Sequence, residues 1–270
     1  MGVDTTLAKS KPQHRLLAEE RRQKIREVLE EEGRITIESI VAKFQVSAVT
    51  ARADLDTLAE RGEALRSHGG AVRQVNPVVD YPLHIKETIH HAEKVRIGQA
   101  AAGLIKPQQT VILDSGTTTA QIARKIRTAR IHPLTVITNA LNIACELAEA
   151  EGVSVIMIGG LLRRASSSFV GPQAERMLQD LHADHLFLAV DGLHPAEGFS
   201  TPDVLEAQLN QIMIRVSNEV TVVADASKFG RRSLSLIGKI DCAHRIITDV
   251  RVPGDAAASL TAKGLELITV

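Results

Sequence analysis

Hydrophobic residues near the start of the chain recur every three or four positions, which is the spacing of one buried helix face. In the segment 19–32 these residues are Ile25, Val28 and Leu29, and Gly33 follows them as a typical helix stop. The acidic residues of the segment are expected to lie on its other face. The pattern predicts a first amphipathic helix over 19–32.

Two further helices are predicted directly after the first. The segment 38–44 has a helical spacing of apolar residues, and Gln45-Val46 interrupts it. Ser47 then precedes a longer helical run that ends at Arg61-Gly62, and its hydroxyl can accept a hydrogen bond from the first turn. Two helices joined by so short a turn cross steeply, so the second can enter the major groove of DNA. The apolar positions of the second run are Val49, Ala53, Leu55 and Leu58.

A short hairpin is predicted after the third helix. Gly69-Gly70 lies between two short alternating runs, which is a typical hairpin signal. Arg66, His68 and Arg73 place positive charge on this hairpin, where a wing would lie along DNA phosphates. The order of helices, turn and basic hairpin indicates a winged helix-turn-helix. A generic three-helix bundle with a charged, solvated surface is the alternative.

Candidate DNA contacts lie in the first two turns of the third helix and on the hairpin. Ser47 and Thr50 suit phosphate or base-edge contacts, and Arg52 suits guanine or phosphate. Asp54 is expected to brace Arg52 or to cap a neighbour, because phosphates repel a carboxylate. The predicted DNA-binding residues are Ser47, Ala48, Thr50, Ala51, Arg52, Arg66, His68 and Arg73.

From Thr110 onward, short apolar runs alternate with amphipathic helical segments, and a helix over 92–104 is expected to open this part of the chain. Strands that are apolar on both faces, with helices between them, predict a parallel sheet covered on both sides. Ligands of such sheets bind at the carboxyl ends of the strands. The predicted strands are 111–113, 134–137, 153–158, 186–190, 220–223, 245–247 and 265–270.

A Gly- and Thr-rich loop, 114–119, joins the first of these strands to a helix. Gly116 lets the backbone approach a ligand closely, and the N–H groups of the helix start can hold a phosphate together with the threonine hydroxyls. An ordinary Ser/Thr helix cap is the alternative. The loop lacks the lysine of a P-loop, and the chain has no GxGxxG motif, so ATP and dinucleotides fit poorly.

Polar residues also follow the other predicted strands. Thr138-Asn139 forms the second loop, and Arg163 or Arg164 in the third could pair with a phosphate through two hydrogen bonds. The fourth loop, 191–201, carries a carboxylate and hydroxyls that could bind sugar hydroxyls. Lys228 in the fifth loop could bind an anion. Surface positions are the alternative for the arginines and for Lys228.

Composition limits the class of protein. A chain of 270 residues holds about two domains, and the sparse aromatics (no Trp, one Tyr, five Phe) require an aliphatic core and disfavour a stacking surface for single-stranded nucleic acid. The net charge of zero disfavours nonspecific DNA coating but permits a local basic patch. Cys145 and Cys242 have apolar neighbours and are interpreted as core residues. Without a membrane-spanning run or a signal core, we expect a cytoplasmic protein.

The segment 46–71 resembles the DeoR-type winged helix-turn-helix. That family has a motif close to V-S-x-x-T-I-R-R-D-L, followed by an arginine and H-G-G-A. The matching residues are Val46, Ser47, Thr50, Arg52, Asp54, Leu55, Arg66, His68, Gly69, Gly70 and Ala71. Ala51 and Ala53 depart from the motif, because the family has isoleucine at the first position and a polar or basic residue at the second. The operator sequence of relatives therefore does not carry over to this chain.

The rest of the chain also resembles the DeoR family, within its amino-sugar (AgaR-like) branch. The similarity extends from about residue 20 to the end, and it implies a sensor fold similar to ribose-5-phosphate isomerase and a phosphorylated-sugar effector. The shared elements are LDSGTTT at 113–119, TN at 138–139, GGxLRR at 159–164, S-F-x-G at 168–171, LFLxVDG at 186–192, G-x-S-T at 198–201, Glu206 with Asn210, and D-x-S-K-F at 225–229.

The resemblance also implies roles for individual residues. By motif match, the loop at 114–119, Arg163 and Lys228 are phosphate-side ligands, and Asp191 and Thr201 are sugar-side ligands. The effector-binding residues expected in this way are Asp114, Ser115, Gly116, Thr117, Thr118, Thr119, Asn139, Gly160, Arg163, Asp191, Thr201 and Lys228.

We therefore expect an α/β protein with a frayed tail (1–19), a winged helix-turn-helix (20–75), a linker (76–90) and a parallel-sheet sensor domain (91–270). Its expected function is that of a sequence-specific, DNA-binding transcriptional regulator, a repressor of sugar catabolism genes released by a phosphorylated (amino) sugar. A symmetric operator requires a homodimer or a homotetramer. We expect no cofactor, no metal and no membrane association. Repression and activation, and dimer and tetramer, remain open alternatives.

An enzyme and a metalloprotein are the two competing interpretations. A sugar-phosphate isomerase would need a carboxylate base, for which Asp191 and Glu206 are the candidates. A metal site would start from His90-His91 or from His182 and His185, but adjacent histidines point apart on a helix, and the spacing supplies no third ligand. We expect neither catalysis nor a metal.

Overall fold

The computed structural model describes residues 16–270 except 61–62, 68, 74–79, 81 and 130. The chain divides into two compact units, Met1–Gln74 and Val75–Val270. Within the described ranges, none of the helices combines the length and the hydropathy that a membrane span needs.

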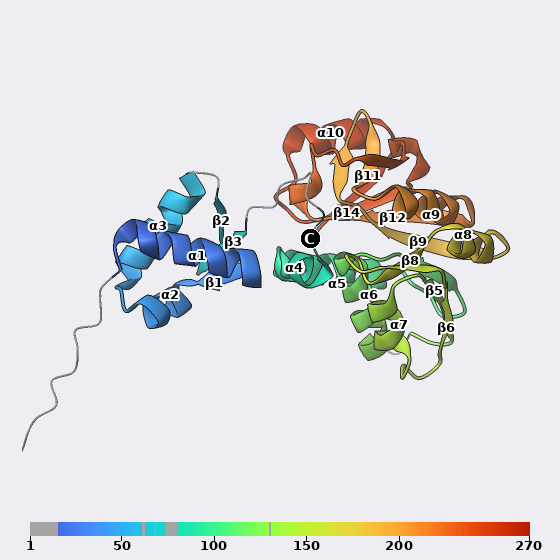
Figure 1. The fold of residues 1–270 in the computed structure, drawn as a ribbon. Coiled ribbons are helices and arrows are strands. Elements are labelled where there is room, and N and C mark those ends of the chain that lie inside the picture. Colours follow the sequence, from blue (N-terminus) through green and yellow to red (C-terminus); the bar gives the residue numbers. More distant parts are fainter. Residues whose placement is uncertain (1–15, 61–62, 68, 74–79, 81, 130) are drawn as a thin grey trace, which may run out of the picture. The chain divides into compact units, whose positions relative to one another are not determined.

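The first unit packs three helices against a small antiparallel sheet of strand order β1-β3-β2 (Figure 1). Aliphatic residues of all three helices form its core, among them Ile25, Leu29, Ile40, Leu55 and Leu58. The predicted winged helix-turn-helix is thereby confirmed. Its elements are α1 (Ala18–Glu32), β1 (Arg34–Thr36), α2 (Ile37–Phe44), α3 (Ala48–Glu60), β2 (Ala64–Ser67) and β3 (Gly70–Arg73).

Glycine and hydroxyl residues set the ends of these helices. Gly33 ends α1 in the left-handed conformation, at φ 74°. Thr36 and Ser39 form a capping box at the start of α2, in which each side chain accepts from the other's backbone N–H at 3.1 Å. Ser47 caps α3, because its Oγ accepts a hydrogen bond from the backbone N–H of Thr50 at 3.1 Å. The turn between α2 and α3 is therefore as short as the sequence predicts.

The second unit is built on a seven-stranded sheet of order β15-β14-β12-β9-β4-β5-β6. Every neighbouring pair of strands is parallel, as the sequence predicts. The strands are β4 (Thr110–Leu113), β5 (Leu134–Thr138), β6 (Val153–Met157), β9 (Ala183–Ala189), β12 (Ser217–Val223), β14 (Arg245–Thr248) and β15 (Glu266–Thr269).

Helices cover both faces of this sheet and enclose two aliphatic cores (Figure 1). Val111 and Leu113 point into the core beneath α5, α6 and α7, whereas Ile112, between them, points into the core beneath α8, α9 and α10. The helices are α5 (His91–Ala102), α6 (Thr117–Ala129), α7 (Leu141–Leu147), α8 (Pro172–Gln179), α9 (Val204–Arg215) and α10 (Gly254–Ala262).

Several short elements lie outside the main sheet and were not predicted. A hairpin joins β7 to β8, and a three-stranded antiparallel sheet has the order β10-β11-β13. These strands are too short for a periodic signal, since they contribute three or four residues each. The elements are β7 (Leu161–Arg163), β8 (Ser168–Val170), β10 (Gly192–His194), β11 (Gly198–Thr201), β13 (Ser235–Gly238) and the 3-10 helices η1 (Ala226–Lys228) and η2 (Ile240–Cys242).

One helix lies inside the range expected to be a linker. Residues Leu83–Thr88 form α4, which contacts α6. Ile85 and Ile89 are buried, so this part of 76–90 belongs to the second unit. The two prolines of the region suggested a linker, but two apolar residues four positions apart are enough to hold one helical turn against a neighbour.

The cysteines depart in part from expectation. Cys145 is exposed on α7, so its interpretation as a core residue is wrong. Cys242 is half-buried against the core beneath α9, and burial, followed by the charge of Asp241, raises the pKa of its thiol to about 11. Neither cysteine forms a disulfide.

Candidate functional site

The recognition-type helix α3 exposes one face along its length. Its buried face follows the spacing i, i+3, i+4, i+7 and turns toward the core of the first unit. The exposed side chains are those of Val49, Arg52, Ala53, Asp56 and Glu60. Arg52 is therefore open to solvent on this face, and its contact with DNA stays a prediction.

Three expectations about this helix are wrong. Ala51 is fully buried, so it packs in the core and cannot contact DNA. Val49 and Ala53, expected among the apolar core positions, are exposed, and Val49 is 73% exposed. The reason is Asp54, a buried carboxylate in the core-facing stripe, which concealed the true period of the helix.

Asp54 is held by the first helix and not by Arg52. The Arg21 guanidinium donates to both carboxylate oxygens, from Nε at 2.5 Å and from Nη2 at 3.1 Å. Arg22 adds a third hydrogen bond from Nε, at 3.1 Å. Asp54 therefore fixes α3 on α1, and the expectation that it braces Arg52 named the wrong partner.

The remaining predicted DNA-binding residues lie at the start of α3 and on the wing. The Ser47 Oγ lies 2.9 Å from the Thr50 Oγ1, and Ala48 is half-buried behind them. Arg66 bonds Asp56 of α3 through Nε at 2.9 Å and donates from Nη1 to the Gly70 carbonyl at 2.9 Å. The wing is thus tied to the recognition helix. His68 and the side chain of Arg73 lie outside the described residues.

In the second unit, polar residues follow five adjacent strands at their carboxyl ends. Because the strands are parallel and neighbouring, these residues form a row along one edge of the sheet. In strand order from β14 to β5 the row is Asp249, Asp225, Asp191, Asp114 and Asn139. The topology thus brings the predicted loops to one edge.

The loop 114–119 is tied together by its own side chains. Asp114 is buried and accepts a hydrogen bond from the Ala189 N–H at 2.9 Å, and burial raises its pKa well above the usual range. The Thr119 Oγ1 accepts from the Gly116 N–H at 2.9 Å and contacts the Asp114 carbonyl at 3.0 Å. The hydroxyl of Thr119 therefore stabilises the loop, and its role as a phosphate ligand stays a prediction.

Gly116 is required for packing against β9. A β-carbon at this position would lie 2.2 Å from the Cβ of Ala189 on β9. Thr117 and Thr118 are nearly buried at the start of α6. The first N–H groups of α6 have no partner within the helix, which is the feature that suits a phosphate.

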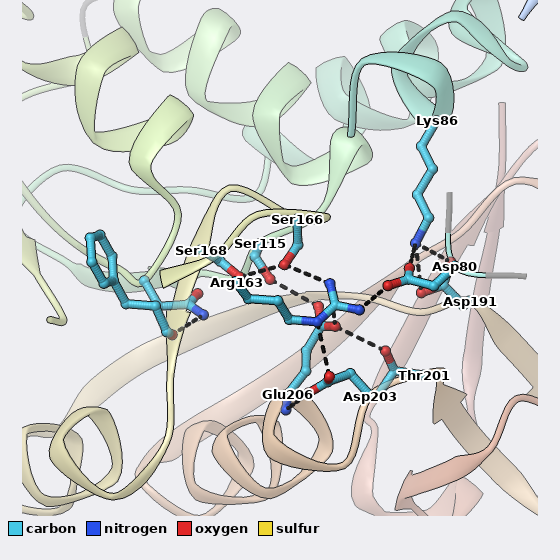
Figure 2. A network of polar contacts seen from close by, with 12 residues as sticks. Asp80, Lys86, Ser115, Arg163, Ser166, Ser168, Asp191, Thr201, Asp203 and Glu206 are labelled. Carbon is cyan, nitrogen blue, oxygen red and sulfur yellow. Dashed lines mark hydrogen bonds and ion pairs between the residues drawn. The ribbon is translucent and has the colours of Figure 1, made fainter. Parts of the chain in front are cut away.

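Arg163, at the end of β7, is surrounded by carboxylates (Figure 2). Its Nε lies 3.0 Å from Asp203, its Nη1 lies 3.6 Å from Glu206, and it forms a short contact with Asp80. The same guanidinium donates to the Ser166 Oγ at 2.8 Å. Arg163 is therefore fully paired before any ligand binds.

Two lysines hold Asp191 after β9. The Lys86 Nζ, from α4, lies 3.1 Å from its carboxylate, and the Lys228 Nζ lies 3.7 Å away. Burial alone would raise the pKa of Asp191, but these two cations outweigh burial and lower it. Asp225 behaves alike: despite burial, Lys228 and Lys94 lower its pKa to about 2.

Glu206 lies at the centre of the cluster. Its two carboxylate oxygens accept hydrogen bonds from the Ser115 Oγ at 3.0 Å and the Thr201 Oγ1 at 3.2 Å (Figure 2). Burial, and next the charge of Asp191, raise the pKa of Glu206, and Arg163 offsets this shift only in part. The glutamate thereby joins the predicted phosphate loop to the predicted sugar-side residue Thr201.

Asn139 and Gly160 serve the β7–β8 hairpin. The Asn139 Nδ2 donates to the Phe169 carbonyl at 3.0 Å, while its Oδ1 is buried without a hydrogen-bond partner in the described structure. Gly160 has φ 155°, and a β-carbon there would lie 2.7 Å from the Val170 carbonyl oxygen. The geometry gives Gly160 a structural role, and its ligand role stays a prediction.

Sequence reasoning missed four charged residues of this cluster, one of which is Asp203, which pairs with Arg163 just before α9. Asp80 and Lys86 fell in the range expected to be a linker, and Lys94 fell in a helix taken as ordinary. Lys94 is buried, and burial lowers its pKa to about 8. One signal was available, because Lys94 occupies the same helix face as Ile97 and Ala101, where a lysine needs a partner.

Of the histidines considered as metal ligands, His90 lies in the field of Asp225 and Lys94, whereas His185 lies away from the cluster. His185 is buried on β9, where its ring stacks on Phe187 and its Nε2 lies 2.7 Å from the Thr221 Oγ1. Burial lowers its pKa to about 4. Among the residues with a described placement, no three His, Cys, Asp or Glu side chains are arranged to hold a metal ion.

Comparison with known families gives a decisive match. Residues 89–250 match the DeoR C terminal sensor domain, and residues 21–75 match the DeoR-like helix-turn-helix domain. The chain belongs to the DeoR family. It is therefore a DNA-binding transcription regulator and not an enzyme.

Curated DeoR-family relatives align over nearly the whole chain. A candidate transcriptional repressor of the aga operon from Escherichia coli O157:H7 is 42% identical over 93% of each chain. The transcriptional repressor AccR of Agrobacterium fabrum is 38% identical over 86% of this chain and 89% of its own. The regulator UlaR of Shigella sonnei is 32% identical over 93% and 98%.

Solved structures resemble this DeoR-family chain more weakly. Ribose-5-phosphate isomerase A of Methanocaldococcus jannaschii has a TM-score of 0.38 and 17% identity over 52% of this chain and 55% of its own. Translation initiation factor eIF-2B of Pyrococcus horikoshii has a TM-score of 0.41 and 17% identity over 81% and 67%. At such scores neither resemblance bears on function.

Proposed function

We propose that this DeoR-family regulator represses genes of sugar catabolism and leaves its operator when a phosphorylated sugar binds the second unit. One observation carries the proposal: Lys86, Arg163 and Lys228 converge on the carboxyl edge of the sheet, beside the start of α6. Cations and a helix N-terminus are the groups that hold a phosphate. The names of relatives as transcriptional repressors support repression.

The hydroxyls and carboxylates of the same cluster suit the sugar part of such a ligand. Ser115 and Thr201 already bond Glu206, and a sugar hydroxyl could exchange with either one without leaving a buried polar group unpaired. Asp191 lies between the two lysines and would accept from a sugar hydroxyl or pair with an amino group. A phosphorylated hexose or amino sugar therefore fits the chemistry of the cluster.

On the DNA side, we assign base and phosphate contacts to the exposed face of α3 and to the wing. Arg52 is exposed on that face, Ser47 and Thr50 lie at its start, and Arg66 lies on the wing. Two copies of the reader are needed for a symmetric operator, so the proposed regulator is a homodimer or a homotetramer. The regulator must have two states that differ in DNA affinity, and the ligand must bind one of them more tightly. A ligand with equal affinity for both states would not change their populations.

The effector side of the proposal is tested with labelled operator DNA and fluorescence anisotropy. Operator fragments are first selected with the purified full chain. Hexose, pentose and amino-sugar phosphates are then titrated beside their unphosphorylated forms, and one phosphorylated sugar is expected to raise the operator Kd at least about tenfold, a coupling of about 1.4 kcal/mol. A panel in which no phosphorylated sugar moves the operator curve refutes the proposal.

Single substitutions separate the two halves of the function. Lys228→Ala is expected to retain operator binding and to lose the response to the sugar, because Lys228 is placed at the effector cluster. Lys125→Ala, at an exposed position of α6, is the matched control and should retain both. Loss of operator binding in Lys228→Ala would instead give Lys228 a structural role.

The DNA-binding assignment is tested in the same assay. Arg52→Ala should weaken operator binding by about 1–3 kcal/mol with relaxed preference at one base pair, if Arg52 reads a base. Arg66→Ala should weaken binding to all sequences and reduce the salt dependence. Arg176→Ala, exposed on α8, is the control. Unchanged binding in both test variants would refute the assignment.

A further inference from the structure

The candidate effector cluster holds more carboxylates than cations. Each carboxylate is paired with, or lies in the field of, at least one of the cations. Leaving aside Arg251, which is paired with Glu93 and Asp249, the cations of the cluster in the described structure are Lys86, Lys94, Arg163 and Lys228, and the carboxylates are Asp80, Asp191, Asp203, Glu206 and Asp225. A sugar phosphate brings a further charge of about −1.5 to −2. Its entry is opposed by this excess and becomes more favourable when one carboxylate leaves.

Most of these carboxylates are fixed by hydrogen bonds to the fold. Asp203 caps α9 by accepting from the Glu206 N–H at 2.9 Å, and Glu206 is itself held by two buried hydroxyls. Asp225 is buried and caps η1 by accepting from the Ser227 N–H at 3.0 Å. Removing any of these would leave donors of the folded core unpaired.

Asp80 is placed differently. It belongs to no helix or strand, and its side chain is 25% exposed. Its carboxylate contacts two cations that come from separate elements, the Lys86 Nζ of α4 at 3.2 Å and the Arg163 guanidinium of β7. Figure 2 shows the carboxylate between the ammonium and the guanidinium. An oxyanion held by a lysine and an arginine is also the geometry in which proteins bind phosphate.

We propose that Asp80 is an internal competitor, whose carboxylate takes the place of the effector's phosphate on Lys86 and Arg163 until the effector displaces it. The identity of that effector as a phosphorylated sugar rests on the proposed function above. Asp80 can leave at a lower cost than Asp203, Glu206 or Asp225, since its loss exposes no capped helix and unpairs no buried hydroxyl. The Asp191 carboxylate also contacts only lysines, but its backbone is held by the Ser200 carbonyl, whereas Asp80 lies outside the helices and strands.

In this proposal, displacement of Asp80 acts on the DNA-binding unit through the chain that joins the two units. Asp80 lies only a few residues beyond Gln74, at which the first unit ends. When the carboxylate is held by Lys86 and Arg163, the chain leading to the first unit is anchored on the sensor. When a phosphate takes those cations, that anchor is lost. The ligand thus binds one anchoring state better than the other, which is the requirement for coupling.

The test measures anion affinity and operator affinity of the full chain in parallel. Asp80→Asn keeps the size of the side chain and removes its charge. At constant ionic strength, calorimetric titration with inorganic phosphate is expected to give at least about tenfold tighter binding than in the wild type, because a competing carboxylate is gone. Without any anion, the operator Kd of Asp80→Asn is expected to rise, because the anchored state has lost its charge pair.

Two further variants make the result specific. Asp80→Glu restores the charge and should return both affinities toward those of the wild type, which a merely misfolded variant would not do. Asp180→Asn removes an exposed carboxylate at the end of α8 and should change neither. Equal or weaker phosphate binding in Asp80→Asn overturns the proposal, as does an unchanged operator Kd.

A negative result in this experiment can be distinguished from a negative result in the test of the proposed function. The phosphate titration uses no sugar, so it gives its answer even if every sugar phosphate leaves the operator curve unmoved. Conversely, a sugar phosphate that releases the wild type and Asp80→Asn at the same concentration supports the proposed function and overturns the competition.

Discussion

The carboxylate of Asp54, on α3, accepts two hydrogen bonds of 2.5 and 3.1 Å from the guanidinium of Arg21, on α1. Both side chains are nearly buried. This bidentate pair sets the orientation of the recognition helix from within the first unit, and leaves its opposite face open for DNA.

Breaking that pair is expected to destabilise the first unit. Asp54→Asn leaves a buried guanidinium without its counter-charge, which costs about 3–5 kcal/mol. Hydrogen exchange of the full chain should show lost protection in α1 and α3, with the sheet of the second unit unaffected. Replacing both partners, as Asp54→Leu with Arg21→Met, should restore much of the protection. Unchanged exchange in Asp54→Asn would show that the pair contributes nothing.

The exposed Val49 is expected to read a thymine. An apolar side chain on the groove-facing surface of a recognition helix contacts the thymine methyl group, which uracil lacks. Substituting uracil for thymine, one operator position at a time, should weaken wild-type binding about fourfold at one position, the effect of one buried methyl group. Val49→Ala should lose that sensitivity, whereas Val250→Ala, an equally exposed valine of the second unit, should retain it. If uracil at no operator position changes the operator Kd, Val49 does not contact a thymine methyl group.

Anion binding should weaken as the pH rises through about 8. Burial lowers the pKa of Lys94 to about 8, so this lysine loses its charge between pH 7 and 9. Lys86 keeps its charge there, because Asp191 and Asp80 outweigh the effect of burial and raise its pKa. Sulfate is the probe, since its own charge is constant over this range. Calorimetry should give a severalfold loss of affinity in the wild type and a flat profile in Lys94→Met.

The same lysine gives a stability prediction of opposite sign. Its folded pKa lies below the unfolded value of 10.5, so between these two pH values the unfolded chain binds more protons than the folded chain. Stability against urea should therefore rise from about pH 8 toward pH 10.5 relative to Lys94→Met. A difference between the two proteins that stays constant over this range would contradict the assignment.

Gly70 is expected to tolerate no side chain. A β-carbon there would lie 2.1 Å from the Ile35 carbonyl oxygen, where β3 pairs with β1. Gly70→Ala must push the wing strand away from β1, at a cost of about 1–3 kcal/mol or more. The operator Kd should rise and the protection of β1 in hydrogen exchange should fall. Gly254→Ala, where a β-carbon meets open space, is the control and should change neither.

Local pattern was enough to predict most helices and all seven strands of the main sheet. Alternation of apolar runs and amphipathic segments depends only on near neighbours, and so do the caps at Ser47 and Gly33. The edge at which the polar loops meet was also predictable, because the carboxyl ends of parallel strands must lie together.

What could not be predicted depends on contacts between distant parts of the chain. Asp54 looked like a surface carboxylate because its partner, Arg21, lies on another helix. Asp80 and Lys86 looked like linker residues because Arg163 and Asp191, which hold them, are far along the sequence. Glu206 was recognised by its motif, but its contact with Ser115 exists only after the sheet has formed.

The contact between Gly116 and Ala189 also restricts how the protein can evolve. Since any β-carbon at position 116 would overlap the Ala189 Cβ at 2.2 Å, a single substitution cannot remodel the loop 114–119 of the proposed binding site. Selection for a new ligand must act instead on partly exposed residues such as Asp80 and Asp191. The ligand to which the protein responds can therefore change while the sheet keeps its structure.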